Sequence, residues 1–258
     1  MTPLKRRLRN LLVLAGDQVS RRRTGARVVT LHDVPSRAAL HDRLSWLQRF
    51  HRIRPLRDLL SEPGEAAVAL TFDDGYASWH DVAMPVLREL SLPATFFVCS
   101  GFVGLAADQA ESFVKQRIRR TRRLVPLTRD QLRRLAEIPD FEIGSHTVNH
   151  ADFSTVAPAE IAGEIQRDRD QLEAMTGRRV SMFAYPFGQA EHARDEAKSA
   201  LADAGFESAF TIVPQFVNDA ADRFSIGRDS LDLTDSERVW SASLRGSYDA
   251  LYRIRHRP

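Results

Sequence analysis

Short apolar runs alternate along this chain with segments whose apolar residues recur at helical spacing. An alternation of strands and helices with short connections favours an α/β fold built on a parallel sheet or barrel. The predicted strands are 28–32, 66–72, 94–99, 141–144, 180–185, 207–212 and 224–226. The predicted helices are 36–50, 79–91, 129–137, 158–176, 192–204 and 235–252. In the first of these helices, Leu40, Leu44, Leu47 and Phe50 are expected in the core.

Length and composition are consistent with one large domain. The chain has 258 residues, of which 43% are hydrophobic, and this is enough for a sizeable core. The sole cysteine, Cys99, excludes an intrachain disulfide and a cysteine-based metal site. No apolar run approaches the roughly 18 residues expected of a membrane span.

Positive charge is concentrated in two segments. Residues 1–27 hold eight Lys or Arg against one Asp, and residues 115–134 hold nine against one. Such patches can meet anionic lipid head groups, an acidic or pyrophosphate-linked glycan, or nucleic acid, and they can also be ordinary solvated helix faces. Aromatic residues are not interleaved with these arginines, which makes nucleic acid an improbable partner.

The segment 1–27 is predicted to be a basic amphipathic helix that precedes a barrel domain over 28–258. Leu4, Leu8, Leu11 and Leu12 fall on one helical face, and flanking arginines suit a membrane surface. Packing of that face against the barrel is the alternative. Because Asp17 and Gln18 interrupt the short apolar stretch, we expect a cytoplasmic protein peripheral at the inner membrane, with export as an open alternative.

Two consecutive acids follow the apolar run 66–72. Asp73 and Asp74 are followed by Gly75, which permits a turn that brings both carboxylates to one mouth. Paired acids at the carboxyl end of a strand can bind a metal and move protons. An ordinary Asp-Asp-Gly turn is the simpler interpretation of these three residues alone.

Two histidines further along the chain favour the metal interpretation. His146 and His150 follow the predicted strand 141–144 and are four residues apart, the spacing of side chains on one side of a helical turn. A catalytic zinc commonly has three protein ligands, and one Asp with two His completes such a set. The alternative is a pair of surface or capping histidines.

These motifs resemble those of the polysaccharide deacetylases of carbohydrate esterase family four, which share the nodulation-type deacetylase homology domain. The family has Thr-Phe-Asp-Asp-Gly, then His-Ser/Thr-x-x-His, then Arg-x-Pro-x-Gly. The corresponding segments here are 71–75, 146–150 and 184–188, in the same order. The resemblance covers about residues 28 to 230 and implies a distorted (β/α) barrel, usually with seven parallel strands.

The resemblance implies a role for each matching residue. Asp74, His146 and His150 would hold a divalent metal, usually Zn²⁺, with Co²⁺, Ni²⁺ or Mn²⁺ as alternatives. Asp73 would be the general base, and the backbone N–H of Tyr76 would contribute to an oxyanion hole. The loop Tyr185, Pro186, Phe187 and Gly188 would line the substrate groove, with both aromatic rings facing a sugar.

The chain departs from the family pattern at the arginine that orients the base. Its position is taken by Ala184, and we predict that Arg228 supplies the missing guanidinium, although an ordinary solvated arginine is the alternative. The usual Leu-x-His motif is also missing after residue 190. His32 lies at the end of the first predicted strand, as in a permuted branch that includes the poly-N-acetylglucosamine deacetylases, and is predicted to be the general acid. A histidine that caps the strand end is its alternative.

The sequence therefore predicts a metal-dependent carbohydrate deacetylase that hydrolyses the acetamido group of an N-acetylated sugar in a polysaccharide or lipid-linked precursor. The basic run near 106–125 is expected to form an inserted helix or lid beside the site. Another amide hydrolase on the same site, such as a deformylase, is an alternative. A catalytically weak glycan-binding protein is another, because the motif arginine is missing.

Overall fold

The computed structural model describes residues 3–19, 24–64, 66–218, 222–249 and 252. Its strands form one parallel sheet in the order β7-β6-β5-β4-β3-β1-β8, and the short β2 pairs with β3. The strands are β1 Arg27–Leu31, β2 Arg52–Ile53, β3 Ala67–Asp74, β4 Ala94–Val98, β5 Phe141–Ser145, β6 Met182–Ala184, β7 Ser208–Phe210 and β8 Asp229–Ser230.

The sheet curls so that its two edges approach one another through a single segment. Ile226 forms a parallel bridge with Phe210 of β7, and β8, a few residues further on, pairs with β1. The predicted strand 224–226 is thus an isolated bridge, whereas β2 and β8 were not predicted. Seven parallel strands in the main path confirm the predicted distorted (β/α) barrel.

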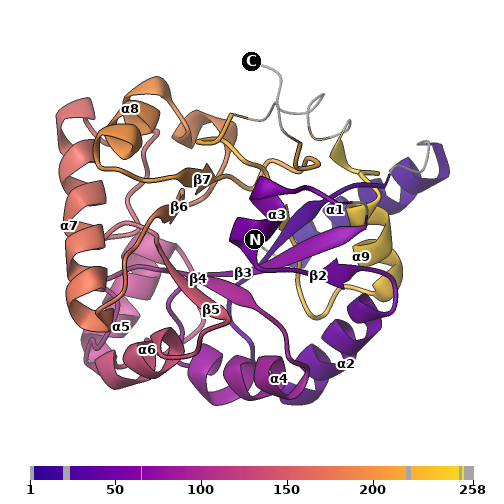
Figure 1. Cartoon of the computed structure of the whole chain (residues 1–258), viewed down its shortest axis with the longest axis horizontal. Helices are drawn as coiled ribbons and strands as arrows, with labels where there is room; N and C mark the ends of the chain where they lie inside the picture. The colour runs from indigo at the N-terminus through magenta and orange to yellow at the C-terminus, as the bar shows by residue number, and fades with distance from the viewer. Residues whose placement is uncertain (1–2, 20–23, 65, 219–221, 250–251, 253–258) are drawn as a thin grey trace.

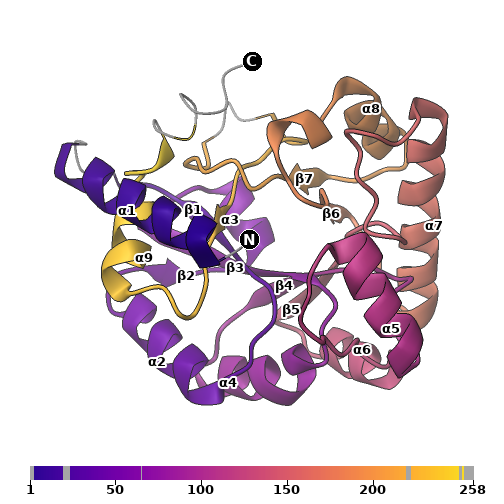
Figure 2. The same ribbon diagram turned by 180° about the vertical axis from the view of Figure 1, so that it is seen from behind.

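Helices surround the curled sheet (Figures 1 and 2). The α-helices are α1 Pro3–Val19, α2 Arg37–Gln48, α3 Leu56–Ser61, α4 Met84–Glu89, α5 Ala107–Phe113, α6 Arg129–Ala136, α7 Pro158–Thr176, α8 Asp195–Asp203 and α9 Glu237–Leu244. Two π-helices, η1 Trp79–Ala83 and η2 Val114–Ile118, and a 3₁₀-helix, η3 Ala190–His192, complete the set. Among the described helices, none has the length and apolar character needed to cross a membrane.

Local sequence accounts for several helix ends. Thr128 accepts a hydrogen bond from the Gln131 N–H while the Gln131 side chain accepts one from the Thr128 N–H, so α6 begins with a capping box. Gly177 ends α7 in the left-handed conformation at φ 66°. Because α2 ends at Gln48, Phe50 lies beyond the helix and is 61% exposed, so its predicted place in the core is wrong.

Helix α1 packs on α9 (Figure 1) through Val13 and Leu14, and not through Leu8 and Leu11. Val13 is fully buried between the two helices, and Asn10 donates to Asp235 at 2.7 Å. Leu8 and Leu11 are 47% and 66% exposed, so the face that the sequence marks as apolar points away from this contact. The side chain of Leu4 lies outside the described residues.

Parallel register brings the strand ends to one edge of the barrel. Asp74 pairs with Val98, and Val98 pairs with Ser145, so β3, β4 and β5 end side by side. The His146 N–H continues the ladder with a bond to the Val98 carbonyl at 3.0 Å. The two motifs, far apart in the sequence, therefore meet at the carboxyl edge of the sheet.

Candidate active site

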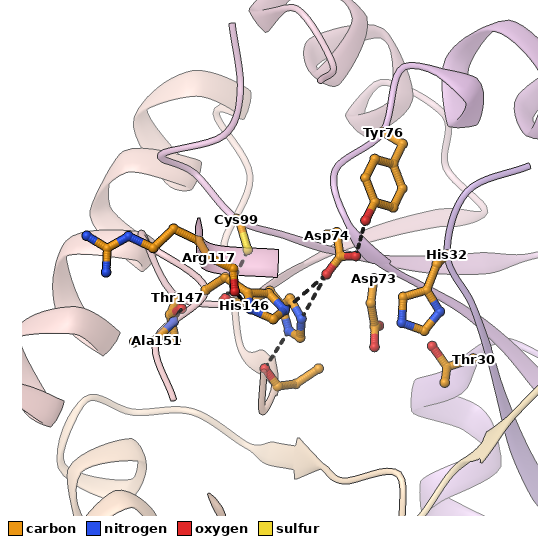
Figure 3. A network of polar contacts seen from close by, with 12 residues as sticks. Thr30, His32, Asp73, Asp74, Tyr76, Cys99, Arg117, His146, Thr147 and Ala151 are labelled. Carbon is orange, nitrogen blue, oxygen red and sulfur yellow. Dashed lines mark hydrogen bonds and ion pairs between the residues drawn. The ribbon is translucent and has the colours of Figure 1, made fainter. Parts of the chain in front are cut away.

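Asp74, His146 and His150 converge at this edge. The Nε2 atoms of His146 and His150 lie 3.4 and 3.3 Å from Oδ1 of Asp74. One ligand atom from each residue lies within 4.8 Å of the other two, and all three side chains are buried. Figure 3 shows His146 directed at Asp74. The structure thus brings together the three side chains that the sequence marks as metal ligands.

The other ring nitrogen of each histidine contacts a backbone carbonyl. His146 Nδ1 lies 2.7 Å from the Ala184 oxygen, and His150 Nδ1 lies 3.1 Å from the Arg117 oxygen. A carbonyl oxygen only accepts, so each Nδ1 carries the proton and each neutral ring directs the lone pair of Nε2 towards Asp74. Three electron-rich atoms that face one another in a buried site fit a cation between them.

The backbone around these ligands is strained. Asp74, Thr147 and His150 have φ angles of 92°, 64° and 51°, in the region that favours glycine, and Gly75 follows at 108°. Non-glycine residues in this region each cost about 1–3 kcal/mol and cluster at functional sites. The turn at Gly75 lets the chain leave β3 beneath the carboxylates.

Burial would raise the pKa of Asp74, but the contacts with the His146 and His150 rings outweigh it and hold this pKa well below its usual value. Burial would likewise lower the pKa of His146, and the contact with Asp74 reverses that shift. The carboxylate is therefore ionised, as a metal ligand must be.

Arg228 holds Asp73 in a two-pronged contact. Its Nη1 and Nη2 donate to the two carboxylate oxygens at 2.7 Å each, Nη1 also donates to Thr71 Oγ1 at 3.1 Å, and Nε donates to the Thr211 carbonyl at 3.1 Å. Thr71 and Asp73 share one face of β3 because side chains alternate along a strand. Burial raises the pKa of Asp73, but the charge of Arg228 more than offsets this, and the pKa lies below its usual value.

His32 lies beside Asp73 on the neighbouring strand. Leu31 pairs with Phe72, so His32 and Asp73 occupy the next positions along neighbouring strands, and Figure 3 shows the imidazole beside this carboxylate. The Trp79 Nε1–H donates to the His32 carbonyl at 2.8 Å and fixes the backbone there. Burial lowers the pKa of His32, although the charges of Asp74 and Asp73 oppose that shift.

Tyr76 contributes in two ways. Its hydroxyl donates to Oδ2 of Asp74, the oxygen that does not face the histidines. Its backbone lies in a bridge to Pro126, where the flanking bonds are Ala77 N–H to Val125 and Leu127 N–H to Gly75. These bonds do not use the Tyr76 N–H, which the sequence analysis assigned to an oxyanion hole.

The loop from Tyr185 to Gly188 only partly matches its expected place in a substrate groove. Tyr185 is 1% exposed and donates from its hydroxyl to the Phe224 carbonyl at 2.9 Å, so the expectation that its ring faces a sugar is wrong. Pro186 and Gly188 are also buried. Phe187 is half-buried, and its ring meets the His150 ring edge to face at 4.6 Å.

Comparisons with known proteins identify the family. The model of the polysaccharide deacetylase family matches residues 61–209, more than half of the chain and both the Asp-Asp-Gly and the His-x-x-x-His motifs. The chain belongs to the polysaccharide deacetylase family. The resemblance stated from the motifs is thereby confirmed.

Relatives of this family member include the poly-beta-1,6-N-acetyl-D-glucosamine N-deacetylase of Escherichia coli (strain K12), which is 29% identical over 182 residues, 60% of this chain and 26% of that protein. The chain spans less than half the length of the curated relatives it matches. IcaB from Ammonifex degensii has a similar fold, with a TM-score of 0.70, 22% identity, and coverage of 87% and 98% of the two chains. Streptococcus pyogenes deacetylase PplD also has a similar fold, with a TM-score of 0.68 and 19% sequence identity, and the match covers 85% of this chain and 98% of that one.

One buried acid of this family member was missed from the sequence. Asp168 of α7 accepts bonds from the Ser100 N–H, the Ser145 hydroxyl and the His146 N–H at 2.9, 2.6 and 3.1 Å, and burial raises its pKa to about 6. It anchors the loop that carries His146. A signal was present, because Asp168 interrupts the apolar stripe formed by Ile161, Ile165 and Leu172.

The basic segment was expected beside the site, and its helix η2 does border the site. The Arg117 carbonyl contacts His150, and Arg122 pairs with Asp33 at 3.1 Å, one residue from His32. A cavity of about 580 Å³ adjoins His150 between this segment and the start of α7. Its polar lining residues include Arg117, Asn149, Asp152 and Glu160.

Proposed function

We propose that this chain is a metal-dependent N-deacetylase that hydrolyses the acetamido group of an N-acetylated sugar in a polysaccharide or a lipid-linked glycan precursor. The observation that supports this most is the buried Asp74-His146-His150 set beside a second carboxylate, Asp73, which is paired with Arg228 instead of with the histidines. This arrangement supports a role for Asp74 in binding a cation and a role for Asp73 in accepting a proton.

Asp74, His146 and His150 would hold the cation, with Zn²⁺ as the proposed occupant and Co²⁺, Ni²⁺ or Mn²⁺ as alternatives. When bound, such an ion polarises the substrate carbonyl and lowers the pKa of bound water from 15.7 to about 7. The protein's part is to fix the ligands. The Ala184 and Arg117 carbonyls set the tautomers of the histidines, and the Tyr76 hydroxyl binds the second oxygen of Asp74.

Proton transfers are assigned to Asp73 and His32. As water attacks the carbonyl carbon, Asp73 accepts its proton, and the Tyr76 N–H donates to the developing oxyanion. His32 then protonates the sugar nitrogen as the C–N bond breaks, which gives acetate and a free amine. Burial lowers the pKa of His32, and this makes its protonated form a stronger acid for that second step.

The cavity beside His150 is proposed to receive the glycan. Hydroxyl-rich ligands require hydrogen-bonding partners, and the lining supplies amide, carboxylate and guanidinium groups from Asn149, Glu160 and Arg117. Phe187 offers a partly exposed ring at its border. This polar lining favours a carbohydrate over an apolar amide substrate.

A metal analysis of the purified chain, combined with acetate release from N-acetylated oligosaccharides, tests the proposal. The panel includes β-1,6-linked and β-1,4-linked N-acetylglucosamine oligomers and their N-formyl counterparts, with Asp73→Asn as the inactive control. Release of acetate by the wild type but not by the control supports an N-deacetylase. Formate release alone indicates a deformylase, and oligosaccharide binding without release of either acid indicates a glycan-binding protein.

For location, we propose a cytoplasmic protein whose helix α1 contacts the inner-membrane surface. Support comes from the exposed Leu8 and Leu11 beside the exposed Arg7. Sedimentation with vesicles containing anionic lipid would test this contact. Binding that is equal for the wild type and a Leu8→Ser/Leu11→Ser variant would contradict it.

A further inference from the structure

The basic segment 106–125 reaches His150 through the end of a π-helix. Helix η2 ends at Ile118, and its C-cap residue is Arg119, which has φ 60° and whose N–H donates to the Val114 carbonyl. Carbonyls in the last turn of a helix have no partner within the helix and need another donor. Here the Arg117 carbonyl receives the His150 Nδ1–H at 3.1 Å, so the inserted segment itself orients a side chain of the candidate metal site.

A closed set of contacts fastens this helix end. Arg119 Nη2 pairs with Asp152 Oδ2 at 3.1 Å, and the other oxygen of Asp152 contacts His192 Nε2 at 3.1 Å. The Phe187 ring lies 4.4 Å from the Arg119 guanidinium carbon and 5.9 Å from the His192 ring. We call these four residues, Arg119, Asp152, His192 and Phe187, the clasp.

The clasp also touches the face of His150. Phe187 meets that imidazole edge to face at 4.6 Å, while the Arg117 carbonyl holds its Nδ1. The direction of Nε2 depends on the orientation of the ring, and these two contacts fix that orientation from different sides. The two contacts come from segments far apart in the sequence. Arg119 is linked to both of them, because it contacts Phe187 directly and lies two residues after Arg117.

We propose that the basic segment is a positioning element for His150 and that Arg119 is the residue that fastens it. This inference rests on the metal site of the proposed function, and it goes further by assigning a purpose to the segment. Arg119 also lines the cavity beside His150, but it reaches the metal site only through Arg117 and Phe187, so for that site it is a positioning residue.

The size of the effect follows from exposure. The Arg119 side chain is 60% exposed and that of Asp152 only 14%, so the ion pair alone contributes little. The effect of Arg119 also includes its contact with the Phe187 ring and, through Arg117 and Phe187, its influence on the orientation of His150. Changes to the groups that orient metal ligands typically reduce metal affinity 10- to 100-fold, and for a residue one step further away we expect about tenfold.

The experiment measures metal affinity instead of turnover. Zn²⁺ dissociation constants are determined by competition with a chromophoric chelator for the wild type, Arg119→Gly, Arg119→Lys and Asp152→Asn. Glycine suits φ 60°, so Arg119→Gly removes the side chain without straining the backbone. Arg123→Ala is the matched control, since it removes an exposed arginine from the same segment.

We expect Arg119→Gly to bind Zn²⁺ about tenfold more weakly than the wild type, Asp152→Asn to weaken binding in the same direction, and Arg123→Ala to leave it unchanged. Arg119→Lys should recover most of the affinity, because an ammonium can still pair with Asp152 and approach the Phe187 ring. The spectrum of the Co²⁺ form should change in Arg119→Gly. Unfolding of the metal-free proteins shows whether each variant is folded.

The outcomes separate this inference from the function on which it rests. If the wild type binds no divalent metal, the proposed metal site fails, and the positioning role fails with it. If the wild type binds metal and a folded Arg119→Gly variant binds it equally tightly with an unchanged Co²⁺ spectrum, only the role of the clasp is overturned. Equal weakening by Arg123→Ala would show a general effect of charge, which also overturns it.

Discussion

Replacing Arg228 with methionine tests the most specific feature of the site. Arg228 is fully buried and makes two bonds to Asp73 and one each to Thr71 and the Thr211 carbonyl. Methionine keeps most of the side-chain volume but leaves Asp73, itself 3% exposed, without a counter-charge. Removal of one partner from a buried ion pair costs about 3–5 kcal/mol of stability, and we expect a loss of that order at neutral pH.

The pH dependence of this loss follows from the sign of the shift. In the wild type, the charge of Arg228 overcomes the effect of burial and holds the pKa of Asp73 below its usual value. The pair therefore stabilises the fold above the unfolded pKa of about 3.9, and this contribution disappears as the pH falls through the lower folded value. Without Arg228, burial raises the pKa of Asp73, so the destabilisation of Arg228→Met should be largest near pH 7 and should shrink in acid.

Two measurements check this prediction. Urea unfolding of both proteins at several pH values gives the difference in free energy, and acetate release against pH gives the acid limb of kcat/KM. We expect the acid limb to move to higher pH and kcat to fall about 100-fold, because the base is no longer held in place. Wild-type stability and wild-type turnover in Arg228→Met would refute the reasoning.

A second substitution distinguishes orientation of the base from general damage. Ala184 occupies the position of the family's motif arginine, and its side chain lies in one apolar cluster with Phe97, over which the Arg228 guanidinium also lies at 5.2 Å. Adding Ala184→Arg to Arg228→Met should recover part of the lost turnover. A variant with Ala184→Arg alone is the control, and it should be destabilised because two cations would then compete for one carboxylate.

Three further predictions concern other residues. Asp74→Ala and His146→Ala should each lose stoichiometric Zn²⁺, as measured by elemental analysis, and should release no acetate in the activity assay. Full activity of a metal-free variant would refute the ligand assignment. His32→Ala should retain Zn²⁺ but lose turnover about 100-fold or more, as expected for a general acid, and undiminished kcat would remove it from that role. Burial raises the pKa of Asp229 to about 7, so the native state holds a proton that the unfolded chain releases, and the stability of the wild type falls as the pH rises from about 4 to 7. In urea unfolding, the stability of Asp229→Asn relative to the wild type should therefore be greatest above pH 7. A difference that does not change with pH would contradict this.

The fold and the cluster of Asp74, His146 and His150 could be predicted from the sequence because both depend on local signals. Strands of a parallel barrel are buried on both faces, so their apolar runs stand out, and a run that stops at Asp73 marks a carboxyl end. Because the carboxyl ends of all parallel strands lie at one edge of the barrel, the sequence alone predicts that Asp74 lies close to the histidines. The short edge strand β8 gave no such run.

Contacts made by the backbone could not be predicted in this way. The Arg117 carbonyl binds His150 because η2 ends where it does, and the letters of the sequence do not record which carbonyl a helix leaves free. Tyr185 shows the opposite failure. An aromatic residue beside a site motif suggests a sugar-stacking ring, yet Tyr185 directly follows β6 and is buried in the core, where its hydroxyl donates to the Phe224 carbonyl.

The exchange of Ala184 and Arg228 shows what the chemistry of the site requires. A buried carboxylate that must remain ionised needs a cation in contact with it, and a two-pronged guanidinium also fixes the plane of its oxygens. The barrel can meet this need from more than one strand end, because the segment that carries Arg228 connects β7 with β1 and its guanidinium reaches Thr71 and Asp73 of β3. Loss of the motif arginine therefore does not by itself indicate loss of activity, since the pair with Asp73 is complete at 2.7 Å on both oxygens.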